Sequence, residues 1–148
     1  MRYNCTIIDL YDRSVVASET GKWITSDLAI RTLEKALCSQ KKKPENLILH
    51  SDQGSQFISS AFILYCMENG IIQSMSAAGC PYDNAPMERY YNTLKTELIN
   101  RFHFHTDEEL NRAISEYAYG WYNQIRPHSY NGYRTPYEVR FGLESFRW

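Results

Sequence analysis

The sequence predicts an α/β fold in which a mixed sheet is covered by helices. Short apolar runs of strand type alternate with stretches of helical spacing, in the order strand, strand, helix, strand, helix, strand. A helical connection between strands favours a right-handed crossover, which places helices over the faces of the sheet. A length of 148 residues with 43% hydrophobic content suits one domain, which we expect to span residues 1–148.

Composition argues against several classes of protein. No apolar run is long enough to span a membrane, and the residues after Met1 lack the regions of a signal peptide. The four cysteines are scattered, so we expect free thiols in a reducing cytoplasm, with no disulfide framework and no structural zinc site. The net charge of −1 argues mildly against indiscriminate coating of nucleic acid. A local basic surface stays open, since tyrosines interleave in the last third with Arg126, Arg134, Arg140 and Arg147.

The first elements are expected to be a hairpin and a helix. Strands at 5–10 and 14–18 are joined by a turn short enough for an antiparallel pair. Thr25 has good N-cap chemistry, and apolar residues follow it at helical spacing to about Gln40. The triple lysine at 41–43 is interpreted as a solvated linker, with a nucleic-acid patch as the alternative.

The stretch at 50–57, His-Ser-Asp-Gln-Gly-Ser-Gln-Phe, organises the rest of the chain. It follows an apolar run at 47–49 that we interpret as a short buried strand, so Asp52 lies at the strand's carboxyl end. Ligands bind at that edge in open α/β sheets because the loops there form a crevice. Gly54 allows a tight turn, and a second carboxylate, Glu88, follows later. Two carboxylates at one crevice repel each other, which points to a divalent cation.

Further helices and a strand follow Asp52. We expect a helix at 59–69, a strand at 71–75, a flexible loop at 76–85 and a long helix from Pro86 to about Phe102. On the long helix Glu88, Asn92 and Lys95 fall within an arc of about 60°. The alternative interpretation is that these three residues form an ordinary solvated face of the helix. The pairing of Glu88 with Asp52 favours a functional site.

The last expected helix begins at Thr106, where Thr-x-x-Glu has the pattern of a capping box. It should stop by Arg126 because a proline follows. The histidines at 103, 105 and 128 have no partner at diagnostic metal-ligand spacing, so we expect loop or surface roles for them.

These residues carry a family resemblance. The chain resembles the catalytic core of a DDE transposase, in the bacterial insertion-sequence group related to retroviral integrases. The matching motifs follow the family order and span nearly the whole chain: 7–13 followed by Val15-Val16, 50–57, 82–88, 94–97 and 121–128.

The resemblance implies a ribonuclease-H-like fold and Mg²⁺- or Mn²⁺-dependent cleavage and transfer of DNA strands during transposition. Asp52 and Glu88 would be the second and third metal-binding carboxylates, and two metal ions would stabilise the attacking and leaving oxygens. Lys95 and Asn92 would face DNA phosphate. The partners would be transposon ends and target DNA, together with further copies of the chain in a homo-oligomer, in the bacterial cytoplasm or nucleoid.

One departure from the family pattern sets a further expectation. In the family, the first catalytic Asp lies on a strand that precedes the match to 7–10. We therefore expect this chain to lack that strand and the N-terminal DNA-binding region, and to be inactive alone. Asp9 matches a non-catalytic position and is given a structural or supporting role. The alternative function is a non-catalytic ribonuclease-H-like module that binds DNA or mediates oligomerisation.

Overall fold

A computed structural model of the chain describes residues 2–42 and 44–143. Lys43, the last of the triple lysine, and Arg147 lie outside the described residues. The four cysteines are free thiols, as expected. None of the described helices is long and apolar enough to cross a membrane.

The chain opens with an antiparallel hairpin of β1 (Tyr3–Ile8) and β2 (Val15–Gly21). The hairpin was expected, but β1 lies two residues earlier than predicted because the chain turns at Asp9, whose carbonyl accepts from the Arg13 N–H at 2.7 Å. Leu10, which the prediction placed in the strand, lies in this turn and is 51% exposed.

Helix α1 (Ser26–Cys38) follows and begins where the sequence predicted. The Thr25 hydroxyl accepts from the Leu28 N–H at 3.2 Å, which satisfies one of the free donors of the first turn. Leu28, Ala29 and Leu33 are buried on its inner face. The helix packs on the hairpin and also contributes to a first core cluster: Ala29, Leu33, Phe62, Cys66 and Ile71.

Strands β3 (Ile48–Ser51) and β4 (Ile72–Met75) form a parallel pair. Two helices, α2 (Ser55–Ile58) and α3 (Ser60–Glu68), make the crossover between them. The prediction of a buried strand is wrong for Ile48, which is 62% exposed, while the other three residues of β3 are partly buried.

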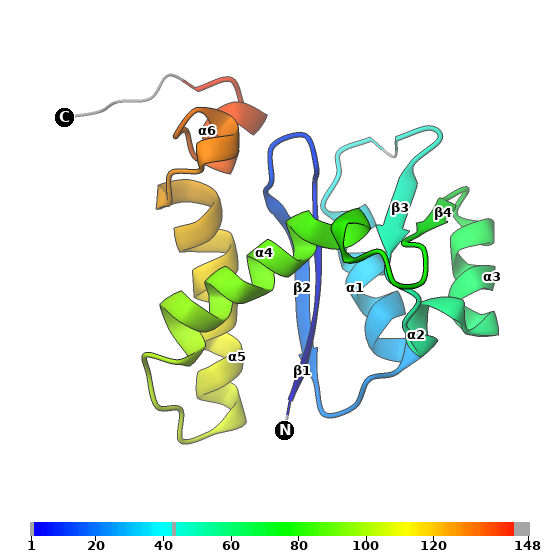
Figure 1. The fold of residues 1–148 in the computed structure, drawn as a ribbon, viewed down its shortest axis with the longest axis horizontal. Helices are drawn as coiled ribbons and strands as arrows, with labels where there is room; N and C mark the ends of the chain where they lie inside the picture. Colours follow the sequence, from blue (N-terminus) through cyan, green and yellow to red (C-terminus); the bar gives the residue numbers. More distant parts are fainter. Residues whose placement is uncertain (1, 43, 144–148) are drawn as a thin grey trace.

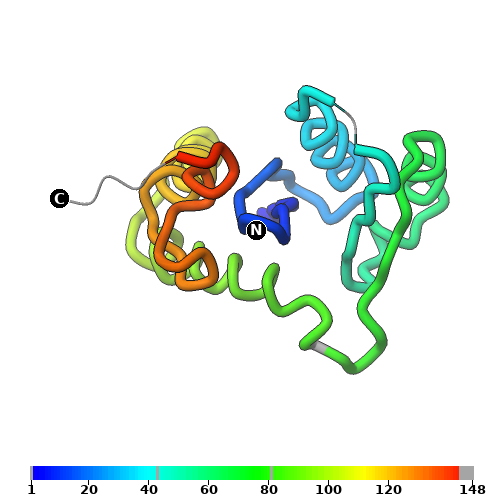
Figure 2. The backbone as a smooth tube through the Cα atoms, turned by 90° about the horizontal axis from the view of Figure 1, so that it is seen from above, coloured from blue at the N-terminus to red at the C-terminus, as the bar shows by residue number. Residues whose placement is uncertain are grey.

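The α/β class is confirmed, but the strands form two separate pairs. Within residues 2–42 and 44–143 the order is β1-β2 in one sheet and β3-β4 in the other. Figure 1 shows β1 and β3 running in opposite directions, with α4 (Ala85–Leu94) crossing in front. Seen from above, the hairpin lies between the C-terminal helices and the group formed by α1, β3 and β4 (Figure 2).

The second half of the chain is helical. The loop before α4 contains a 3₁₀ turn, η1 (Pro81–Asn84). The long helix predicted to reach Phe102 changes to a π-helical segment, η2 (Lys95–Ile99). Helix α5 (Asp107–Ser115) begins at the predicted Thr106 cap, at which the Glu109 N–H donates to the threonine hydroxyl at 3.1 Å. It continues as the π-helical segment η3 (Glu116–Ile125), and the chain then forms η4 (Ser129–Asn131) and α6 (Pro136–Arg140).

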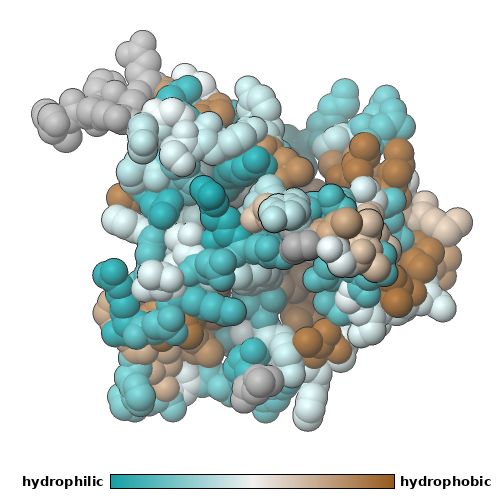
Figure 3. Space-filling model, in the orientation of Figure 1, coloured by the Kyte–Doolittle hydropathy of each residue, from teal (hydrophilic) through white to brown (hydrophobic). Residues whose placement is uncertain are grey.

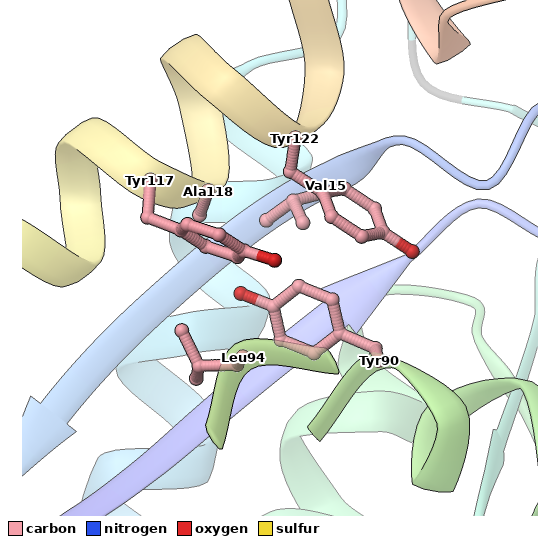
Figure 4. Close-up of a cluster of buried hydrophobic side chains, with 6 residues drawn as sticks. All are labelled: Val15, Tyr90, Leu94, Tyr117, Ala118 and Tyr122. Atoms are coloured by element: carbon pink, nitrogen blue, oxygen red, sulfur yellow. The ribbon is translucent and has the colours of Figure 1, made fainter. Parts of the chain in front are cut away.

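A second core joins the hairpin to the C-terminal helices (Figure 4). Its buried members are Val15, Tyr90, Leu94, Tyr117, Ala118 and Tyr122. The rings of Tyr90 and Tyr122 meet edge to face with their centroids 5.0 Å apart. Tyr90 is completely buried, and its hydroxyl has no hydrogen-bond partner among the described residues.

The structure corrects part of the prediction for His128, for which a loop or surface role was expected. His128 lies in a loop, as expected, but it is buried and not on the surface. Its ring packs edge to face on Tyr122 at 4.4 Å, and its Nε2 lies 3.0 Å from the Tyr122 carbonyl. Burial lowers the pKa of this imidazole below its usual 6.5.

Side chains from η3 satisfy the outer edge of β2. The Asn123 amide accepts from the Val15 N–H at 2.7 Å and donates to the Val15 carbonyl at 3.0 Å. The Tyr119 hydroxyl accepts from the Ser18 N–H at 2.8 Å. Polar side chains therefore occupy the positions that another strand would take.

We expect Asn123→Ala to lower the free energy of unfolding by about 2–4 kcal/mol, because it leaves a buried donor and a buried acceptor of Val15 without partners. The measurement is urea unfolding of the purified chain. The matched control is Asn111→Ala, which makes the same change on the exposed side of α5. Equal stability of the two variants would contradict the bridging role of Asn123.

Candidate metal and nucleic-acid site

A groove of about 1210 Å³ separates the two sheets. One wall is formed by β1 and the other by β3, and α4 contributes Glu88 and Tyr91. The two carboxylates that the sequence singled out, Asp52 and Glu88, thus line the same groove although they lie on different elements.

Asp52 is held in a tight turn directly after β3. Its Oδ1 accepts from the Gly54 N–H at 2.8 Å, a bond that fixes the carboxylate relative to the backbone. A Cβ at position 54 would lie 2.9 Å from the same oxygen, so a larger residue there would have to shift the Asp52 carboxylate. The tight turn that the sequence predicted is present, and Asp52 is exposed to solvent at its start.

His50 anchors the end of β3 beside Asp52. Its Nδ1 lies 2.9 Å from the Ser74 hydroxyl, and its Nε2 lies 3.0 Å from the Ser76 hydroxyl. The Gln53 amide also donates to the Ser76 carbonyl, at 3.1 Å. These bonds hold the segment that carries Asp52 against the end of β4.

Glu88 lies in the first turn of α4, after the proline at its start. It is exposed and makes no hydrogen bond or ion pair with the other described residues. Asn92 follows one turn later on α4, and Lys95 is the first residue of η2; both are exposed. The predicted trio therefore lies along one helical stretch that faces solvent.

The two carboxylates suit a hard divalent cation. Mg²⁺ prefers oxygen ligands and is commonly bound through one or two carboxylates together with water and substrate phosphates. Among the described residues, no group of three or more His, Cys, Asp and Glu side chains is placed to hold a metal ion. Asp52 and Glu88 offer two carboxylates, and water and phosphate oxygens can add further ligands.

Asp9 takes part in a different network. Its Oδ2 lies 3.0 Å from a guanidinium nitrogen of Arg140, and its Oδ1 accepts from the Tyr11 N–H. Arg140 also pairs with the buried carboxylate of Asp12 at 3.0 Å. This network fastens α6 to the turn of the hairpin, an arrangement that supports the structural role expected for Asp9.

Two residues that line the groove were not among the site residues predicted from the sequence. Tyr91 lies one turn after Glu88, and its hydroxyl reaches the backbone of β1. Cys5 lies on β1 in the same groove. Burial raises the pKa of both groups, and the negative charge of Asp52 adds to each shift. The signal for Tyr91 was its spacing of three from Glu88, which places both on one helix face.

The fold places the chain in the integrase-core class of structures, and the sequence comparisons give the family. Two models described as integrase core domain match residues 1–81 and 69–136. The chain belongs to the integrase core domain family. It is 38% identical over 134 residues to the transposase for insertion sequence element IS904 of Lactococcus lactis, covering 90% of this chain and 53% of that protein. It is 35% identical to transposase InsF for insertion sequence IS3A of Escherichia coli, covering 90% and 46%.

The chain thus spans about half the length of the curated relatives it matches. Solved structures confirm the ribonuclease-H-like fold. The catalytic core domain of BIV integrase has a TM-score of 0.69 at 19% identity, covering 94% of this chain and 85% of that one. A chain of the simian T-cell lymphotropic virus intasome has a TM-score of 0.72 at 20% identity, covering 97% and 49%. The HTLV-2 integrase core in complex with magnesium, a trimeric form, has a TM-score of 0.63 at 20% identity, covering 94% and 90%.

We expect His50→Ala to loosen the β3–β4 pair, because two hydroxyl contacts of the ring are lost at the strand ends. The expected cost is about 1–2 kcal/mol. The measurement is amide hydrogen exchange at Ser76, whose N–H donates to the Ser51 carbonyl at 2.9 Å. His103→Ala, at an exposed histidine, is the control; the same exchange rate in both variants would refute the anchoring role.

Proposed function

We propose that this chain is the catalytic core of a DDE transposase and that it serves metal-dependent cleavage and transfer of DNA strands. The observation that carries the proposal is the position of Asp52 and Glu88 along one groove, in a chain of the integrase core family. Transposition of a bacterial insertion sequence takes place on DNA in the cytoplasm, which is where we place the protein.

Asp52 and Glu88 are the proposed ligands of Mg²⁺ or Mn²⁺. When bound, such an ion polarises a phosphodiester and stabilises the oxygens that attack and leave. The protein's own part is to hold the carboxylates in place. The Gly54 N–H and the His50 anchor fix the segment that carries Asp52, while α4 fixes Glu88.

The proposed partners are transposon ends and target DNA. Lys95 and Asn92 are exposed along the stretch that carries Glu88, where an ammonium and an amide can contact phosphate oxygens beside the metal ligands. Since the net charge of the chain is −1, affinity would depend on this local surface.

We also propose that copies of the chain associate. Helix α3 buries Phe62 and Cys66, yet its outer face is apolar as well, with Leu64 55% and Met67 71% exposed. Figure 3 shows hydrophobic surface gathered on this side of the molecule. An apolar face of this kind favours a protein partner, and a homo-oligomer is the arrangement we propose.

We propose that the isolated chain is inactive on DNA by itself. Two carboxylates can hold one ion weakly, and in-line displacement needs both the attacking and the leaving oxygen stabilised. The lack of a three-residue cluster among the described residues also favours the second candidate, a non-catalytic module that binds DNA or oligomerises.

The first test is Mn²⁺ binding by the purified chain, followed by paramagnetic resonance. We expect weak binding that falls about tenfold or more in Asp52→Asn and in Glu88→Gln, because each change removes a charged ligand. An asparagine oxygen can still accept from the Gly54 N–H, so the turn is retained. Glu68→Gln, at an exposed residue of α3, should bind as the unmodified chain does.

Any metal-dependent cleavage of duplex DNA ends should also fall, by about 10²- to 10³-fold in both site variants. Unchanged Mn²⁺ binding and unchanged cleavage would refute the assigned site. Mn²⁺ binding that depends on both residues, without any cleavage of DNA, would favour the non-catalytic module.

The second test concerns DNA. Binding of a labelled duplex, followed by fluorescence anisotropy, should weaken steeply as salt rises. Lys95→Ala should reduce, by about one, the slope of the logarithm of the binding constant against the logarithm of the salt concentration. This is the change expected for the loss of one phosphate contact. Lys22→Ala removes an exposed lysine just after β2 and should leave the slope unchanged. Tight binding that ignores salt would contradict the proposed phosphate contacts.

A further inference from the structure

We propose that a cleft between η2 and η3 binds one unpaired nucleobase of a DNA strand whose phosphates lie along η2. This inference rests on the proposal that the chain acts on DNA, and it assigns a partner to a base, whereas the metal site concerns phosphate oxygens alone. It is carried by the lining of the cleft, by the exposure of Trp121, and by the cations at the two ends of η2.

The cleft has a volume of about 670 Å³ and is separate from the groove that contains Asp52. None of its described lining residues also lines that groove. Its size lies within the range of about 300–1,000 Å³ that is typical of ligand sites. One wall comes from η2 and the residues after it, and the other comes from α5 and η3. The cleft is therefore a second place at which the chain can hold a ligand.

Trp121 is available to such a ligand, unlike its neighbours in the chain. It begins the motif at 121–128, in which Tyr122 and Asn123 are buried in the core. Trp121 itself lines the cleft and is 44% exposed, and Phe102 on the other wall is 60% exposed. Exposed aromatic rings beside a cationic surface are where the bases of single strands stack, because every base has a flat π-face.

An ion pair fixes the two walls and sets the charge between them. The Arg126 Nε donates to both carboxylate oxygens of Glu97, at 2.8 and 2.9 Å, and the Tyr117 hydroxyl donates to the same carboxylate at 3.2 Å. Pairing cancels the charge of Glu97, and the exposed Glu116 in the lining would repel a phosphate. The lining therefore suits an uncharged ring whose edge carries donors and acceptors, as a base does.

Cations lie at both ends of η2, outside the ion pair. Lys95 is its first residue, and Arg101 follows shortly after its end; both are exposed, and Arg101 lines the cleft. The Arg101 Nε donates to the Thr96 carbonyl at 3.2 Å, which turns the guanidinium back along η2. A strand with phosphates at Lys95 and Arg101 would pass over Leu98, which lies between them in the chain and lines the cleft. Its base can then enter the cleft while its phosphates stay at the rim.

The ligand has to be an unpaired base. A paired base is stacked inside its duplex and reaches a protein cleft only after it has left the stack, which costs a few kcal/mol. A single strand does not carry this cost. Single strands are therefore the probe that reports on the cleft most directly.

The test compares two short labelled strands at low salt, in EDTA and without added metal. One is an oligothymidylate, and the other is an abasic oligomer of the same length, which has the same phosphates and no bases. Fluorescence anisotropy with the purified chain should show the abasic oligomer binding about 5- to 100-fold more weakly, because base stacking is lost. Equal affinities would show that only phosphates are bound and would overturn the proposal.

Two tryptophan variants assign the difference to the cleft. Trp121→Leu keeps an apolar side chain and removes the flat ring, so oligothymidylate should bind at least about fivefold more weakly while the affinity for the abasic oligomer stays the same. Trp23→Leu makes the same change at a residue that is 73% exposed in the loop after β2, and it should change neither affinity. Thermal unfolding checks that both variants remain folded. The same oligothymidylate affinity in the two variants would contradict stacking on Trp121.

Crosslinking locates the base without any substitution in the chain. An oligothymidylate that carries 5-bromouracil in place of one thymine is irradiated in the complex, and the adduct is mapped by mass spectrometry. We expect adducts at Trp121 or Phe102, and adducts confined to residues outside the cleft would refute the proposal. Sedimentation without DNA that shows a dimer in the unmodified chain and a monomer in Trp121→Leu would also overturn it, since the cleft would then be covered by a second copy.

The outcomes separate this inference from the proposed function. Equal binding of the two oligomers overturns the base site and leaves the phosphate contact of Lys95 in place. Failure of both oligomers and of duplex DNA to bind would contradict both proposals. Because no metal is present, none of these measurements depends on Asp52 or Glu88 as metal ligands.

Discussion

The backbone groups on both edges of the β1–β2 hairpin need hydrogen-bond partners, and the rest of the structure depends on how that need is met. An unpaired backbone group in a buried position costs about as much as a lost hydrogen bond. Asn123 and Tyr119 meet the need on the outer edge, and Tyr91 meets part of it on the inner edge. These contacts bring two helical segments, η3 and α4, against opposite edges of one small sheet. Since α4 also carries Glu88, the position of a proposed metal ligand follows from the hydrogen bonding of the hairpin.

The features that could be predicted from the sequence are those decided by near neighbours. The Thr25 and Thr106 caps each depend on an N–H three residues away, and both form as expected. The turn after β3 depends on Asp52 and Gly54, which are two residues apart. The placement of Asp52 after a strand and of Glu88 on a helix was likewise predicted, from the apolar run at 47–49 and from Pro86 at the start of the helix.

The features that could not be predicted join residues far apart in the chain. The separation of the two sheets depends on which strand edges meet, and short strands with a similar apolar pattern do not encode their partner. The change from α- to π-helix at Lys95 has no counterpart in the local spacing. It accompanies a long-range contact, since Glu97 in this segment pairs with Arg126 at 2.8 Å. The ion pairs of Arg140 with Asp9 and Asp12 cross most of the chain in the same way.

The two core clusters have a consequence for the folding of the molecule. One contains Val15, Tyr90 and Tyr122, and the other contains Leu33, Phe62 and Ile71, so each side of the groove has its own buried interior. Regions with separate interiors can open independently, as cooperative units of different stability. Helices α1 and α4 and their contacts with β1 are then what couples one unit to the other. Anything that fills the groove and touches both walls would add to this coupling, so the chain would open more nearly as a whole.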